Sequence, residues 1–191
     1  MKSILSRRFL IAGAVASLAV PLVSSEAGAQ AFAPARDPWK GREITNSERI
    51  RVTSQGDHVA RLLTGIDGIE YGMMDNHYRV RVPEGLLFVQ GKDELSGQGV
   101  RLLTAMAPAF LKAKRTITEI VVHHGNLGNS YAAYVVSERR AEAVKAGLAS
   151  RSVEPTRLKA TGLGDRFPLR DETYVLGMNT RRTEFLIRPL A

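Results

Sequence analysis

The chain has 191 residues, of which 44% are hydrophobic and 24% charged, a composition typical of a globular protein with a single core. It has a formal net charge of +8 and contains no cysteine. The lack of cysteine excludes a disulfide framework and a lipid anchor on an N-terminal cysteine.

The first 29 residues have the pattern of a secretory signal peptide. Lys2, Arg7 and Arg8 precede an apolar stretch over residues 9–23. Small residues after this stretch fit cleavage after Ala29 or Ala31. The stretch is shorter than the ~18 residues of a spanning helix, so a retained membrane anchor is the less favoured alternative. The arginine pair also fits a twin-arginine export signal, although two arginines can simply supply basic charge. We expect export to the periplasm, with association with the outer membrane or the cell wall.

The net charge bears on the partners of an exported chain. A basic surface outside the cytoplasm favours anionic cell-wall polymer or lipid headgroups as partners and disfavours nucleic acid. The alternative is a solvated surface without an anionic partner, which would have the same composition. Residues 30–56 mix proline, charge and turn formers without an apolar period, so we expect a linker or arm there and a folded domain over residues 57–191. Trp39 is the one large anchor of this arm, and we expect it to dock on its own domain.

The first half of the domain shows strand and helix patterns in turn. A short helix is expected over residues 58–63, and Asp75-Asn76 form a turn between two β-leaning runs, the second of which alternates apolar and arginine residues over 78–82. Residues 100–111 have helical spacing behind Ser96, a suitable N-cap. Pro108 should kink or shorten that helix.

The second half continues the alternation. Residues 116–124 form a β-branched run, residues 131–150 have helical spacing, and two further strands are expected over 156–164 and 182–189. The order β-α-β-α-β-β predicts an α+β fold, a two-layer sandwich with helices on one face of a mixed sheet.

Arg140 is an unusual residue on the predicted helix over 131–150. It lies four residues after Val136 and four before Val144, so it shares the face that should meet the sheet. A guanidinium there needs anionic or carbonyl partners, because burying an unpaired charge is very costly. One interpretation is an internal ion pair with Asp165 or Glu184. The other is that the guanidinium is positioned to bind a ligand carboxylate.

Three segments together resemble a known family. They are Ser137-Glu138-Arg139-Arg140-Ala141, then Gly162-Leu163-Gly164 with Pro168 after it, then Arg181-Arg182-Thr183-Glu184-Phe185. In order and spacing they resemble the OmpA-like C-terminal domain of outer-membrane porins, peptidoglycan-associated lipoproteins and flagellar stator proteins, over roughly residues 68–189. The resemblance implies a non-catalytic domain that binds the peptide stem of peptidoglycan at its diaminopimelate residue.

The family's ligand residues transfer only in part. The arginine that takes the ligand carboxylate matches Arg140, and Arg182 matches a second arginine of the pattern. The family's ammonium-binding aspartate falls on Gly125, which has no anion, so diaminopimelate binding would depend on neutral contacts from His124, Gly125 and Asn126.

Other functions have weaker sequence support. His123 and His124 are neighbours on a strand and should point to opposite faces, so they cannot readily share a metal ion, and we expect no cofactor. No nucleophile elbow, P-loop or zinc-protease motif is present, so we expect no enzyme activity. The alternative to wall binding is a retained fold with a lost wall site, acting as a protein-interaction module whose arm over residues 30–56 binds an envelope partner.

Overall fold

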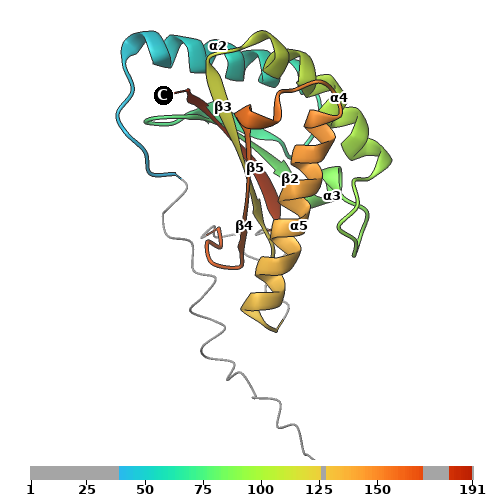
Figure 1. Ribbon diagram of the computed structural model, residues 1–191. Helices are drawn as coiled ribbons and strands as arrows, with labels where there is room; N and C mark the ends of the chain where they lie inside the picture. The colour runs from blue at the N-terminus through green and yellow to red at the C-terminus, as the bar shows by residue number, and fades with distance from the viewer. Residues whose placement is uncertain (1–38, 126–127, 170–180, 191) are drawn as a thin grey trace, which may run out of the picture.

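The computed structural model describes residues 39–125, 128–169 and 181–190 (Figure 1). The expected signal segment over residues 1–29 and most of the expected arm therefore lie outside the described residues. In the described part of the chain, no helix is long and apolar enough to cross a membrane.

A five-stranded mixed sheet forms one layer. Its strands are β1 (Glu70–Met73), β2 (Tyr78–Pro83), β3 (Thr116–His123), β4 (Leu158–Gly164) and β5 (Arg182–Pro189), in the spatial order β1-β2-β5-β3-β4. The pairing of β3 with β4 is parallel, and every other pairing is antiparallel. The last strand of the chain therefore lies at the centre of the sheet, between β2 and β3.

The helices lie on one face of this sheet, as the sequence predicts. They are α2 (Asn46–Leu62), the single turn α3 (Glu84–Leu87), α4 (Gly97–Lys112) and α5 (Ser130–Ala149), with a 3₁₀ turn η1 (Pro155–Arg157) before β4. Figure 1 shows α4 and α5 over the sheet and α2 across its upper end. Their apolar side chains form the main core with the inward residues of the strands, among them Val80, Ile120, Val122, Phe185 and Ile187. The α+β sandwich with a mixed sheet is confirmed.

The N-terminal boundary of the domain differs from the prediction. The chain turns helical at Asn46, so residues 46–56, expected as part of an extended arm, belong to α2. Thr45 and Glu48 form a capping box there, in which each side chain accepts from the other residue's backbone N–H. The helix also buries Val52 and Val59 in the core. The capping pattern was readable from sequence, but the weak apolar period of this mostly polar helix concealed it.

Two local predictions about α4 have different outcomes. Ser96 caps the helix as expected, because its hydroxyl accepts from the N–H of Gly99 at 2.9 Å. Pro108 does not shorten the helix, which continues to Lys112. The burial of Met106 and Phe110 on either side of the proline supplies packing that outweighs one lost backbone hydrogen bond.

The contact between α5 and β4 explains two of the three family-like segments. The backbone N–H of Gly164 donates to the hydroxyl of Ser137 at 2.9 Å, and that of Gly162 donates to the carboxylate of Glu138 at 2.8 Å. A Cβ on Gly162 would lie 2.4 Å from the backbone nitrogen of Glu138, which is far too close. Glycine at 162 therefore lets the helix backbone approach the strand, and this approach holds α5 and Arg140 in place.

Candidate functional site

Arg140 lies on the buried face of α5, with only 2% of its surface exposed. Its Nη1 is 2.8 Å from Glu84 Oε2, and its Nε is 3.4 Å from Asp93 Oδ1. Its Nη2 donates to the carbonyl oxygen of Lys92 at 2.8 Å, and the guanidinium lies 5.0 Å from the ring centre of Phe88. Arg140 therefore joins α5 to α3 and to the segment between α3 and α4.

The guanidinium is neutralised without being saturated by hydrogen bonds. Neither Nε nor Nη1 of Arg140 is aligned for a hydrogen bond with any residue in the described ranges, and the same holds for Glu84 Oε2. The two carboxylates thus supply charge at short range but leave N–H groups open to a better acceptor. Nε and Nη1 of Arg140 are therefore buried donors without an aligned acceptor among the described residues.

His124 lies beside this ion pair at the end of β3. It is buried, and its backbone N–H donates to the carbonyl oxygen of Gly164 at 2.9 Å. Burial lowers the pKa of the imidazole; Arg140 and Arg181 lower it further, while the carboxylates of Glu84 and Asp93 act in the opposite direction. At neutral pH His124 is therefore uncharged and offers a polar edge, as the sequence suggested. We call Glu84, Phe88, Asp93, His124 and Arg140 the Arg140 cluster.

The loop that follows holds the remaining expected contacts. Gly125 is buried and comes directly after His124, so its backbone adjoins the Arg140 cluster. Asn126 lies outside the described residues. Asn129 then caps α5, because its side-chain oxygen accepts from the N–H groups of Tyr131 and Ala132 at 2.8 and 3.3 Å.

The internal ion pair considered for Arg140 exists, but with other partners than expected. Asp165 accepts a hydrogen bond from the hydroxyl of Ser130 at 3.0 Å, and Glu184 lies on the other face of the sheet. Sequence reasoning missed Glu84 altogether, since nothing local links it to a helix more than 50 residues later. The carboxylate of Asp93, just before α4, also faces Arg140.

Arg182 does not join the Arg140 cluster. It pairs in register with His123, one residue before His124, and successive residues of a strand point to opposite faces. Its Nε donates to Glu184 Oε1 at 2.8 Å, and its terminal nitrogens donate to the carbonyl oxygen of Phe167 at 3.2 Å. Of the two neighbouring residues Arg181 and Arg182, Arg181 is the one whose charge affects the pKa of His124. The single site expected from the resemblance is thus divided between two faces.

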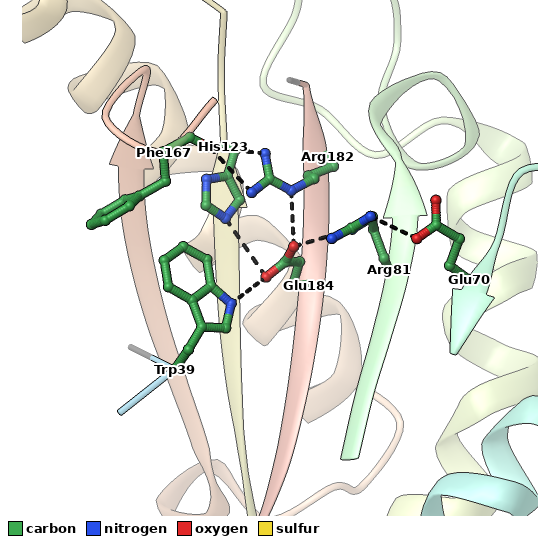
Figure 2. A network of polar contacts seen from close by, with 7 residues as sticks. All are labelled: Trp39, Glu70, Arg81, His123, Phe167, Arg182 and Glu184. Atoms are coloured by element: carbon green, nitrogen blue, oxygen red, sulfur yellow. Dashed lines mark hydrogen bonds and ion pairs between the residues drawn. The ribbon is translucent and has the colours of Figure 1, made fainter. Parts of the chain in front are cut away.

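Figure 2 shows the second group, which we call the Glu184 cluster: Trp39, Arg81, His123, Arg182 and Glu184. The carboxylate of Glu184 is fully buried and accepts from Arg81 Nε at 3.2 Å as well as from Arg182. Its second oxygen accepts from the indole N–H of Trp39 at 2.8 Å. Three donors from three distant segments therefore surround one carboxylate on the face of the sheet that the helices leave uncovered.

Charge in the Glu184 cluster is distributed asymmetrically. Burial acts to raise the pKa of Glu184, but His123, Arg182 and the indole donor outweigh it and hold the pKa at about 2. Burial lowers the pKa of His123 to about 3, with a further contribution from Arg182. At neutral pH His123 is uncharged, so the arginines keep the carboxylate ionised. The hydrogen bond from Trp39 attaches the segment before α2 to the sheet.

Trp39 docks on its own domain, as predicted. Its ring stacks on His123 with centroids 5.7 Å apart and meets the edge of Phe167 at 4.8 Å. His123 and His124 point to opposite faces, as expected, one toward Trp39 and the other toward Arg140. Among the described residues, no group of three or more histidine, aspartate or glutamate side chains is placed to hold a metal ion.

Comparison with known proteins assigns this architecture to a family. The model of the OmpA family matches residues 87–181, a range that contains α4, β3, α5 and β4. Among solved structures, a MotB-like protein from Desulfovibrio vulgaris is 25% identical with a TM-score of 0.64, over 76% of this chain and 98% of that one. The cell wall anchor of the T6SS from Pseudomonas aeruginosa shares the fold at 20% identity and a TM-score of 0.58, over 69% of this chain and 96% of that one.

A curated relative matches more distantly. "Probable lipoprotein YiaD" of Escherichia coli strain K12 is 22% identical over 124 residues, which are 64% of this chain and 57% of the relative. The chain thus matches little more than half of that protein's length. Through residues 87–181, the chain belongs to the OmpA family.

Proposed function

We propose that this protein is a non-catalytic component of the cell envelope that associates non-covalently with peptidoglycan, with Arg140 as the principal contact. The observation that carries the proposal is the family match over residues 87–181, a range that includes Arg140. A similar structure is that of a cell wall anchor, and the basic net charge suits an anionic polymer. The periplasm is the compartment that this role requires.

The Arg140 cluster suggests how a peptide stem would bind. A ligand carboxylate would approach Nε and Nη1 of Arg140, whose N–H groups are not aligned with the carboxylates beside them. Glu84 and Asp93 would then be free to face a ligand ammonium, in place of the aspartate that the family carries at position 125. His124 and Gly125 would add neutral contacts at the same loop. Two protein carboxylates thus offer the negative charge that Gly125 lacks, and diaminopimelate has both groups that this exchange needs.

Co-sedimentation with purified sacculi tests the proposal. Wild type should pellet with the sacculi, and free diaminopimelate should compete. Arg140→Ala should remain in the supernatant, and so should Arg140→Lys, which keeps the charge but loses the planar fork. Arg101→Gln, at an exposed position of α4, removes one positive charge elsewhere and should pellet like wild type. Unchanged pelleting of folded Arg140→Lys, or pelleting that only salt abolishes, would overturn the role of Arg140.

A second candidate function is favoured by the internal neutralisation of Arg140. A guanidinium already paired with Glu84 and Asp93 is what a domain that has lost wall binding would retain for stability. Such a domain would serve as a protein-interaction module in an envelope assembly. The arm proposed for that role is shorter than the sequence suggested, because residues 46–56 are helical and Trp39 is docked on the sheet. Failure of wild type to bind sacculi, with unchanged capture of envelope proteins, would favour this candidate.

A further inference from the structure

A basic groove lies at the opposite end of the helical layer from Arg140, between α2, the end of α4 and the start of β3. It has a volume of about 450 Å³. Its lining includes five cationic side chains and no carboxylate: Arg51, Arg61, Lys112, Lys114 and Arg115. Within the part of the chain that the structure describes, none of the five forms an ion pair. Most basic side chains of a folded domain have acidic neighbours, so this concentration of charge is unusual.

Helix polarity accounts for part of this charge. Lys112 and Arg61 lie in the last turns of α4 and α2, where cations complement the helix dipole. That explanation does not apply to Arg51, in the first half of α2. Nor does it bear on a neutral residue that lines the same groove, Gln55.

Gln55 supplies the observation that points to a ligand. Only 4% of its surface is exposed, and its side-chain oxygen accepts from the hydroxyl of Thr116 at 2.5 Å. The same hydroxyl accepts from Arg157 at 3.3 Å and lies 3.1 Å from the carbonyl oxygen of Ala113. The amide nitrogen of Gln55 then has no acceptor among the described residues, and neither does the buried Nε of Arg51. Unpaired buried donors cost about 1–3 kcal/mol each, so two beside one groove call for an acceptor.

We infer that this groove binds a phosphate group, with the amide of Gln55 and Nε of Arg51 donating to its oxygens. Phosphate suits the groove because it combines several acceptor oxygens with up to two negative charges, whereas a single carboxylate would leave most of the five cations unneutralised. Ile50, which is 69% exposed, forms part of the rim and would contact an apolar portion of the same ligand. The phosphate could belong to a lipid headgroup or to a soluble phosphorylated compound.

Titration of the full chain with inorganic phosphate, followed by NMR of side-chain amides, tests the inference. The Gln55 amide signals should shift saturably with a Kd of about 1 mM, while chloride at matched ionic strength should not move them. Gln55→Glu keeps the oxygen that Thr116 needs but places a carboxylate in the groove. In that variant, shifts of the Arg51 side chain should require roughly tenfold more phosphate. Arg139→Gln, which removes an exposed charge of α5, should bind like wild type.

Vesicle flotation distinguishes the two sources of phosphate. Vesicles of phosphatidylglycerol in phosphatidylcholine should float wild type but not Gln55→Glu if the ligand is a headgroup, and vesicles of phosphatidylcholine alone should float neither. Phosphate binding without flotation would assign the groove to a soluble phosphorylated ligand. No saturable shift of the Gln55 amide, or equal weakening by Gln55→Glu and Arg139→Gln, would overturn the inference. Neither measurement uses sacculi, so the outcome is independent of the proposed wall binding.

Discussion

Trp39 and Glu184 are 145 residues apart in the sequence, yet the indole N–H of one donates to the carboxylate of the other at 2.8 Å. This bond attaches the segment before α2 to the face of the sheet that the helices leave uncovered (Figure 2). It also supplies one of the three donors around a carboxylate with no exposed surface. The N-terminal segment at Trp39 is therefore part of the folded domain.

Removing the indole should weaken the fold. Trp39→Ala loses both the hydrogen bond and the cover over His123 and Glu184, so we expect the free energy of unfolding to fall by about 2–4 kcal/mol. Trp39→Phe keeps a ring and loses only the donor, at a cost of about 1–2 kcal/mol. Trp39 is the single tryptophan of the chain, so neither variant can be followed by tryptophan fluorescence. Urea unfolding followed by far-UV circular dichroism measures the stability of both variants. Wild-type stability in both variants would mean that Trp39 is not docked in solution.

The buried imidazole of His123 should make stability depend on pH. The pKa of His123 is about 3 in the folded protein and 6.5 in an unfolded chain. Between these two pH values the unfolded state binds a proton at His123 and the folded state does not. Stability should therefore fall as the pH drops from 6.5 toward 3. His123→Phe removes the group that binds this proton. Between pH 7 and pH 5, the free energy of unfolding of this variant should fall by about 2 kcal/mol less than that of wild type. Parallel pH profiles would show that His123 is not buried as described.

The close contact between α5 and β4 should tolerate no side chain at position 162. Gly162→Ala would drive a methyl group into the backbone at Glu138 and force the helix away from the strand, at a cost of roughly 2 kcal/mol or more. Gly85→Ala is the matched control, because no atom lies within 4 Å of a Cβ built there. Thermal unfolding should separate the two variants, and equal melting temperatures would argue against the close contact.

The exchange of partners proposed for Glu84 should be visible in wall binding. Glu84→Gln preserves the shape of the side chain and removes one of the two negative charges beside the guanidinium. Because the proposed exchange places Glu84 against the ligand ammonium, loss of its charge should weaken sacculus binding by about 1 kcal/mol, roughly fivefold. Glu94→Gln removes an exposed charge nearby and should change nothing. Tighter binding of Glu84→Gln would contradict this exchange, because it would mean that Glu84 only competes with the ligand for Arg140.

Most of the secondary structure could be predicted because its signals are local. The alternation around Tyr78, the cap at Ser96 and the apolar spacing of α5 each lie within one window of sequence, and each element forms where expected. The exceptions show where local signals fail. The helical start at Asn46 is supported by a capping box but by few apolar residues, and the continuation of α4 past Pro108 depends on burial that the window does not reveal.

The candidate site could be predicted only in part. Arg140 was identified from its position on an apolar face, and the structure confirms that it is buried against the domain. Its partners Glu84 and Asp93 could not be found, because they are more than 40 residues away in the sequence and meet Arg140 only in the folded chain. Arg182 lies on the opposite face of the sheet from Arg140, because a shift of one residue along a strand reverses the direction of the side chain.

By itself the sequence determined the class of the fold, the order of its main elements and the buried arginine on α5. These features depend on periodicity and on motifs, which are properties of neighbouring residues. The tertiary structure alone decided which charges meet: Glu84 with Arg140 on one face, Glu184 with Trp39 and Arg182 on the other, and the cations of the basic groove without an acid. Electrostatic and hydrogen-bond partners act over a few ångströms, so they are fixed only when the chain has brought distant segments together.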